Sequence, residues 1–351
     1  MLFDIINANI EQLVIHRIGS RTDNTENVYS QKCVEMMGEE SPVPFLLKQY
    51  FLASFREPSL YHLGGTKGIT ENIVYQSVCA IFDNPALFYE HSRILAALLY
   101  ENSSHPQIKP GEFYLTLFNG VQIFDQTVKC LGIFKSENKE TYLKICSGEN
   151  SFDVNYEEGI NIRKLDKGCL IFNIEREKGF VASLIDKVSK QNEALFWKED
   201  FLGLEERQDY NYFTHNYLNV CKGFAEDYLS PANEIPRTEQ IDMLNRSINY
   251  FKDNTLFNEN KFEKDVLDTP DIVDAFNQFK EFYERENDIS LNQEFKISPD
   301  VVKKENKYFK SVLKLDKNFH VYVHGNRQFI EKGFDQSRGL HYYRLFFEHE
   351  T

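Results

Sequence analysis

Residues 111–146 read GEFYLTLFNGVQIFDQTVKCLGIFKSENKETYLKIC, and this stretch decides the fold. Before it, apolar residues recur at helical spacing; from residue 112 onward the period changes to two, which is typical of strands. Six short strands are predicted, separated by turn signals such as Asn119-Gly120. They are Glu112–Phe118, Thr127–Lys135, Thr141–Cys146, Asn161–Leu165, Cys169–Ile174 and Phe180–Asp186. Parallel neighbours need long crossovers, so this short spacing predicts an antiparallel meander.

The preceding part of the chain predicts one strand and three helices. Ile10–Ile18 alternates in the manner of a strand. One helix is predicted to start at Ser41-Pro42 and another at Asn84-Pro85, because proline is tolerated in a first helical turn. Thr70 is the predicted N-cap of the helix between them. The glycine-rich loop at residues 64–68 lacks the GxxxxGK[ST] spacing of a phosphate-binding loop, which favours a surface turn.

After residue 193 the sequence predicts an acidic helical layer. Three apolar stripes at helical spacing run over residues 210–228, 241–251 and 272–283. Residues 191–300 hold 11 Lys and Arg against 24 Asp and Glu, in a chain of net charge −14. Exposed helix faces carry charge as a rule, which favours a solvated surface. We therefore predict an α+β fold: N-terminal helices with an antiparallel sheet in domain 1–205, then an acidic helical layer and a C-terminal β-hairpin in domain 206–351.

Simple counts exclude several classes of protein. No stretch approaches 18 uninterrupted apolar residues, and the first residues do not resemble a signal peptide, so no membrane association is predicted. No CxxC pair occurs among the six cysteines, which predicts six reduced thiols and no structural metal. His320 and His324 lie four residues apart on a predicted strand, about 13 Å, which is too far for one metal ion. We predict no catalytic residue and no cofactor.

The C-terminal segment is the region with a basic excess. Residues 301–344 hold 10 Lys and Arg against 4 Asp and Glu. The pattern predicts a short helix from Ser298 to about Phe309, a hairpin over residues 309–325 and a last strand at His341–Phe347. The candidate DNA-binding residues are Lys303, Lys304, Lys307, Lys310, Lys314, Lys317, His320, Tyr322, His324 and Arg327. Phosphate binding and an ordinary exposed sheet face with lysines guarding an edge strand are both open interpretations.

Several blocks of sequence carry a family resemblance. They are IEQLVIHRIGS at 10–20, FYEHSRILAALLYENSSHPQIKPGEFYLTLF at 88–118, GIFKSENKETYLKI at 132–145, EEGINIRKLDKGCLIFN at 157–173 and FKSVLKLDKNFHVYVHG at 309–325. In their number and order they resemble the bacterial nucleoid-associated protein family, in the form found in Bacteroidetes-type bacteria. The resemblance implies a cytoplasmic protein that localises to the nucleoid, associates with DNA and has no established catalytic residues. It supplies no DNA-contact residues.

Three functional hypotheses follow. The first is a non-catalytic protein that binds DNA, double-stranded and with low sequence specificity, through phosphate contacts of the C-terminal basic face. The second is an adaptor recruited to the nucleoid by a protein partner that docks on the acidic helices. The third is a metal-dependent nucleic-acid enzyme, whose carboxylates would converge only in the folded chain. The oligomeric state is open, with a homodimer among the alternatives.

Overall fold

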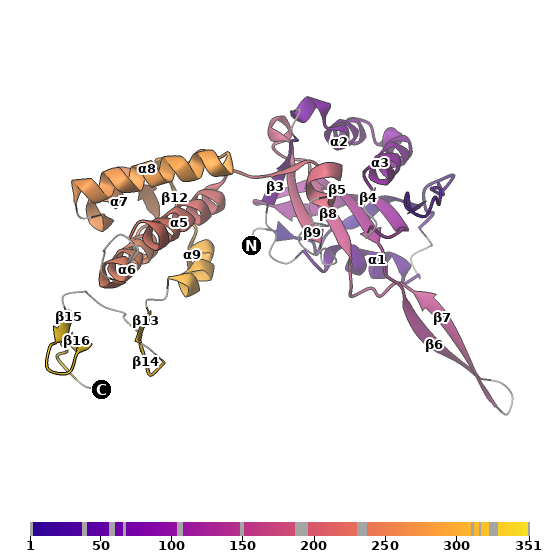
Figure 1. Cartoon of the computed structure of the whole chain (residues 1–351). Coiled ribbons are helices and arrows are strands. Elements are labelled where there is room, and N and C mark those ends of the chain that lie inside the picture. The colour runs from indigo at the N-terminus through magenta and orange to yellow at the C-terminus, as the bar shows by residue number, and fades with distance from the viewer. Residues whose placement is uncertain are drawn as a thin grey trace. The chain divides into compact units, whose positions relative to one another are not determined.

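The structure is a computed structural model that describes residues 3–36, 41–55, 60–65, 68–103, 108–147, 151–186, 196–229, 237–267, 269–309, 312–315, 317–322 and 329–349. The chain divides into two compact units, Met1–Arg207 and Gln208–Thr351, which are described separately. The predicted α+β class is confirmed. Helices and an antiparallel sheet form the first part, helices the middle, and β-hairpins the C-terminal part (Figure 1).

The first unit is built on an antiparallel sheet. Its strand order is β1-β4-β5-β8-β9-β3-β10, and β2 pairs with β4 as well. The strands are β1 Phe3–Asp4, β2 Asn9–Ile18, β3 Leu60–Leu63, β4 Gly111–Ile123, β5 Gln126–Ser136, β8 Lys167–Phe172, β9 Val181–Asp186 and β10 Leu204–Glu206. The run β4-β5-β8-β9 confirms the predicted meander. The remaining hairpin, β6 Glu140–Ser147 with β7 Phe152–Gly159, forms a separate two-stranded sheet between β5 and β8 in the chain.

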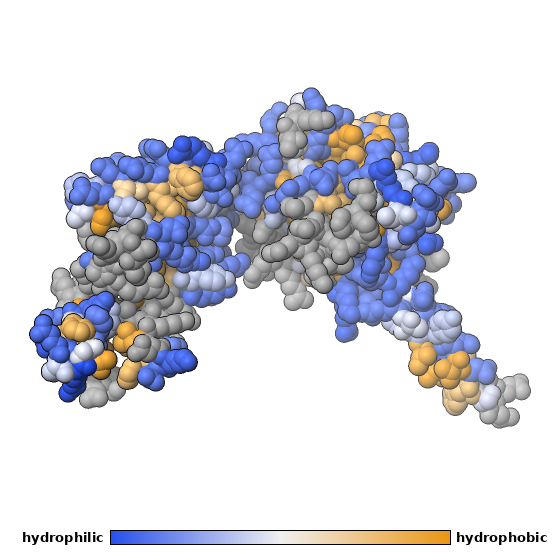
Figure 2. All heavy atoms as spheres, in the orientation of Figure 1, coloured by the Kyte–Doolittle hydropathy of each residue, from blue (hydrophilic) through white to orange (hydrophobic). Residues whose placement is uncertain are grey.

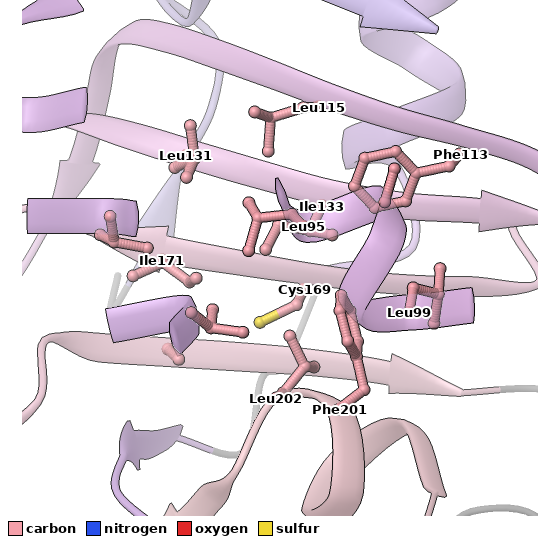
Figure 3. Packing of buried hydrophobic residues seen from close by; sticks show 14 of the residues in the cluster. Leu95, Leu99, Phe113, Leu115, Leu131, Ile133, Cys169, Ile171, Phe201 and Leu202 are labelled. Atoms are coloured by element: carbon pink, nitrogen blue, oxygen red, sulfur yellow. The ribbon is translucent and has the colours of Figure 1, made fainter. Parts of the chain in front are cut away.

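Helices cover both faces of this sheet. Helix α1, Val43–Leu52, packs Phe51 against Phe118 and Phe134 on one face. On the other face lie α2 Ile73–Asp83 and α3 Phe88–Asn102, with Leu95 and Leu99 among the apolar side chains in Figure 3. Because both faces are covered, residues of both parities are buried in the central strands, and all six residues of β8 are buried.

Local details in the first unit correct two predictions. Residues 161–165 form no strand, because the Asn161 carbonyl accepts the Lys164 N–H at 2.9 Å and its side chain accepts the Arg163 N–H, also at 2.9 Å. This turn uses the backbone groups that a strand would need. Thr70 is not the N-cap of α2, since residues 69–71 form a 3₁₀ turn and Asn72 caps the helix by accepting the Tyr75 N–H at 2.9 Å.

The second unit is a helical layer with three two-stranded sheets. Its helices are α5 Tyr210–Asp227, α6 Arg237–Asp253, α7 Glu259–Val266, α8 Pro270–Asn287 and α9 Pro299–Glu305, the last followed by the 3₁₀ turn η6 Asn306–Tyr308. One sheet pairs β11 Leu256–Asn258 with β12 Glu294–Lys296 across the intervening α7 and α8. The other two are hairpins, β13 Val312–Leu315 with β14 Phe319–Tyr322 and β15 Ile330–Asp335 with β16 Leu340–Leu345. The predicted last strand therefore ends at Leu345 and has a partner that was not predicted.

The core of the second unit is largely aromatic. Phe257 lies at its centre, with ring centroids 4.2 Å from Tyr217 and 4.7 Å from Phe295. A smaller apolar contact joins Ile241 of α6 to Leu315, Val321, Ile330 and Tyr343, and so holds both C-terminal hairpins. None of the helices that the structure describes has the length and apolarity needed to cross a membrane. All six cysteines are free.

Candidate nucleic-acid interface

The short helix α9 displays three of the predicted lysines. Ser298 caps it, with Oγ accepting the Val301 N–H at 3.3 Å, while the Ser298 N–H donates to Thr214 Oγ1 of α5 at 3.0 Å. Val302 and Phe309 are buried in the core of the second unit, which fixes the rotation of the segment. The structure thereby brings the exposed side chains of Lys303, Lys304 and Lys307 together on one helical segment.

An aromatic ring and a fourth lysine join this group. Tyr308 is 52% exposed, and its ring centroid lies 4.6 Å from Lys307 Nζ and 5.1 Å from Lys222 Nζ. Both distances are within the range of a cation–π interaction. Lys222 belongs to α5, about 80 residues earlier in the chain. It stands as a lone cation in its stretch of sequence, so no local charge pattern could have singled it out.

The ion pairs near α9 leave part of this positive charge unneutralised. Of the two carboxylates on the helix, Asp300 lies in the first turn and Glu305 lies 3.4 Å from His215 Nδ1. Within the described ranges no carboxylate forms an ion pair with Lys303, Lys307 or Lys222. We define the lysine–tyrosine group as Lys222, Lys303, Lys304, Lys307 and Tyr308. Ammonium groups beside a phenol can bind an anion and donate a hydrogen bond to it, as phosphate contacts require.

The hairpin β13–β14 holds a second set of predicted residues. Its register places Lys314 opposite His320, with Val312 opposite Tyr322. Residues so paired share one face of the hairpin, as strand alternation predicts. Lys317 lies in the exposed turn between the strands. Lys310, His324 and Arg327 lie outside the described residues, and of Lys314 and Tyr322 only the backbone is described.

The apolar face of this hairpin is covered only in part. Leu315 and Val321 contact Ile241, whereas Phe319 is 64% exposed. Phe319 is the strand residue next to the turn, and the contact around Ile241 does not reach it. The hairpin thus leaves one phenylalanine uncovered at its tip.

The last hairpin adds little free charge. Arg338 lies 3.7 Å from Asp335, and Arg344 lies 3.4 Å from Glu331, each within β15–β16. After residue 328 the sequence holds three Lys and Arg against four Asp and Glu, so the basic excess of the C-terminal segment lies before this hairpin. The candidate site therefore rests on Lys303 of α9, Lys307 of η6 and Lys222 of α5.

One buried histidine–serine pair resembles a catalytic dyad and is structural. His16 Nε2 lies 2.9 Å from Ser92 Oγ, and His16 Nδ1 accepts the Ser30 N–H at 3.1 Å. Both side chains are fully buried, and Ser92 Oγ also donates to the Tyr89 carbonyl at 2.6 Å. Burial, with a smaller contribution from Arg93, lowers the pKa of His16 to about 4. The neutral imidazole therefore ties β2 to α3, out of reach of any substrate.

No metal centre emerges from the folded chain where the structure describes it. No three His, Cys, Asp or Glu side chains among those residues gather closely enough to hold an ion. The arrangement of exposed residues on the second unit instead suits the binding of an anionic polymer by cations and an aromatic ring.

These features define a class: an α+β protein whose candidate site is suited to binding phosphate groups. A comparison with models of protein families also indicates a protein associated with DNA. The family model described as nucleoid-associated protein YejK matches residues 14–337, most of the chain and parts of both units. The chain belongs to this family, which confirms the resemblance inferred from the sequence blocks. No curated protein matches the sequence.

Proposed function

We propose that this chain is a non-catalytic DNA-binding protein of the cytoplasmic nucleoid, which holds the phosphate backbone of duplex DNA with the lysine–tyrosine group and the basic face of β13–β14. The observation that carries the proposal is a set of three cations in an acidic chain: the exposed Lys303 and Lys307, and the half-buried Lys222 beside Tyr308. Within the described ranges none of the three forms an ion pair with a carboxylate. Membership of a nucleoid-associated family supports it.

The mode of binding follows from the chemistry of these groups. Lysine is a point charge with three donors, which neutralises a phosphate but does not distinguish bases. Helix α9 is only seven residues long and its lysines lie in its last turn, so it does not resemble a recognition helix. We therefore expect backbone contacts with little base readout. The net charge of −14 opposes the approach of DNA, which makes the affinity modest.

The first experiment separates the three hypotheses. Purified full-length protein is mixed with duplex DNA, with and without Mg²⁺, and analysed by gel shift. A retarded and uncut band supports the proposal. An unshifted band supports the adaptor, for which the exposed acidic residues of α8, such as Asp271 and Asp274, offer a docking surface. A band cut only with Mg²⁺ supports the enzyme.

The second experiment tests the residues. The double substitution Lys303→Glu and Lys307→Glu should weaken binding roughly tenfold or more and reduce the slope of log K against log salt by about two units. Its control is Lys252→Glu with Lys264→Glu, which changes the net charge equally. Lys252 and Lys264 are also exposed lysines in last helical turns of the second unit. Equal losses in the two double variants would rule out a local site. Fluorescence anisotropy at several salt concentrations measures both quantities.

A further inference from the structure

The β6–β7 arm of the first unit is a two-stranded ribbon that stands apart from the main sheet. Eight residue pairs, from Glu140↔Gly159 to Ser147↔Phe152, hold the strands in regular antiparallel register. In Figure 1 the ribbon projects from the sheet of the first unit, and neither strand pairs with another strand of the described chain. An isolated two-stranded ribbon is marginally stable in water, so its exposed faces matter for its stability.

The two faces of the arm differ sharply in chemistry. Cross-strand alternation places five large apolar side chains on one face, each between 64% and 75% exposed. They are Leu143, Ile145, Phe152, Val154 and Tyr156. The opposite face is polar and carries the ion pair between Lys144 Nζ and Glu157 Oε1 at 2.7 Å. Figure 2 shows the apolar surface gathered along the arm. A ribbon in water on both sides has no reason to segregate its residues in this way.

DNA does not fit this apolar face. No lysine or arginine lies among its side chains, and phosphates bind through cations. The one lysine of the ribbon, Lys144, is on the other face and is already paired. The arm is therefore separate from the proposed DNA contact, in residues and in chemistry.

A second copy of this chain is electrostatically compatible with the apolar face of the arm. Two copies of net charge −14 repel one another over most of their surfaces. Between residues 143–147 and 152–156, the apolar face carries no ionisable carboxylate or ammonium, so it is a place where two acidic chains can meet without bringing like charges together. An apolar face is complementary to itself, which is the requirement for a two-fold contact.

The exposed apolar area of the arm is also large enough for a contact between two copies. At the exposures given above, the five side chains present roughly 600 Å² per arm. Two arms packed together would then bury about 1,200 Å² in total, the lower end of stable protein interfaces. Edge-to-edge pairing of two arms would leave this face in water, so face-to-face packing is the arrangement that buries it.

We propose that the β6–β7 arm is a dimerisation element: arms from two copies pack through the face formed by Leu143, Ile145, Phe152, Val154 and Tyr156. A two-fold axis near the middle of the face passes close to Ile145 and Val154. The polar faces with Lys144 and Glu157 point outward from the pair. The contact area corresponds to a reversible dimer whose population depends on protein concentration.

The test starts from the full-length protein in analytical ultracentrifugation over a range of concentrations. The wild type should form a dimer. Ile145→Thr with Val154→Thr keeps β-branched residues in the strands and should raise the dimer dissociation constant roughly a hundredfold or more. The control, Tyr142→Thr with Asn155→Thr on the polar face, should leave it unchanged. A monomeric wild type, or equal behaviour of the two double variants, would overturn the proposal.

Cross-linking gives a readout that does not depend on loss of the dimer. In a Cys146→Ser background, Val154→Cys should cross-link between copies with a short bis-maleimide, because the residue lies near the proposed two-fold axis. Asn155→Cys, the next residue on the same strand, points to the other face and should not. Equal cross-linking of the two variants would show that the apolar face does not form the contact.

Discussion

Strands β5 and β8 lie in the middle of the main sheet, and the chain between them makes the β6–β7 arm. Both regions are regular antiparallel pairs that carry large apolar side chains. The residues of β8 are all buried, whereas most residues of β6 and β7 are exposed. The backbone pairing is the same, and the difference is the presence of helices over the sheet. Strand formation and burial are therefore separate events in this fold.

The largest expected contrast comes from one substitution made in both regions. Phe134→Ala on β5 removes a buried ring that lies 4.4 Å, centroid to centroid, from the Phe51 ring of α1, and should lower the free energy of unfolding by about 4 kcal/mol. Phe152→Ala on the arm removes a ring that is 74% exposed and should cost under about 0.5 kcal/mol in the monomer.

The measurement is urea unfolding followed by tryptophan fluorescence at low protein concentration. The single tryptophan, Trp197, is buried in the first unit and so reports on the unit that holds both strands. Similar losses from Phe134→Ala and Phe152→Ala would mean that the arm is covered within one copy.

Two Lys–Glu ion pairs, one buried in the main sheet and one exposed on the arm, provide a second comparison of the two regions. Lys135 on β5 is fully buried, donates to the Lys109 carbonyl at 2.7 Å and pairs with the buried Glu137 at 2.8 Å. Lys135→Met leaves that carboxylate without its cation in a dry site and should cost about 3 kcal/mol. Lys144→Met on the arm breaks an exposed pair with Glu157 and should leave the urea midpoint unchanged. A Lys135→Met protein as stable as the wild type would refute the assignment of Lys135 as a structural charge.

Acid should weaken the covered sheet through His16. Its pKa is lowered from 6.5 to about 4 in the fold, so the unfolded chain binds the proton first as the pH falls. The stability from this group is complete above pH 6.5 and is lost toward pH 4, by about 2.5 kcal/mol between pH 6.5 and 4.5. Urea midpoints recorded across this range should fall less steeply for His16→Gln than for the wild type. Parallel curves for the two proteins would contradict the prediction.

The sequence predicted most strands and helices because their signals are local. The strand predicted at Thr127–Lys135 and the helical stripe predicted over residues 272–283 were confirmed by β5 and α8. The strand predicted at 161–165 failed because the Asn161 turn captures backbone groups, whereas Phe152, Val154 and Tyr156 on β7 were not recognised among the acidic residues of that stretch. Of the candidate site, the position of Lys303, Lys304 and Lys307 on one short helix followed from their spacing.

The sequence by itself determined the spacing of apolar residues in each segment, the class of fold and the separation of acidic from basic regions. These properties depend on neighbouring residues and on composition. Only the tertiary structure decided which apolar faces are covered. The apolar face of the β6–β7 arm is uncovered, while that of β5 and β8 is buried under α1, α2 and α3. It also decided that Lys222 approaches Tyr308 and that Lys135 is buried. These outcomes depend on contacts between residues far apart in the chain, and no local pattern records such contacts.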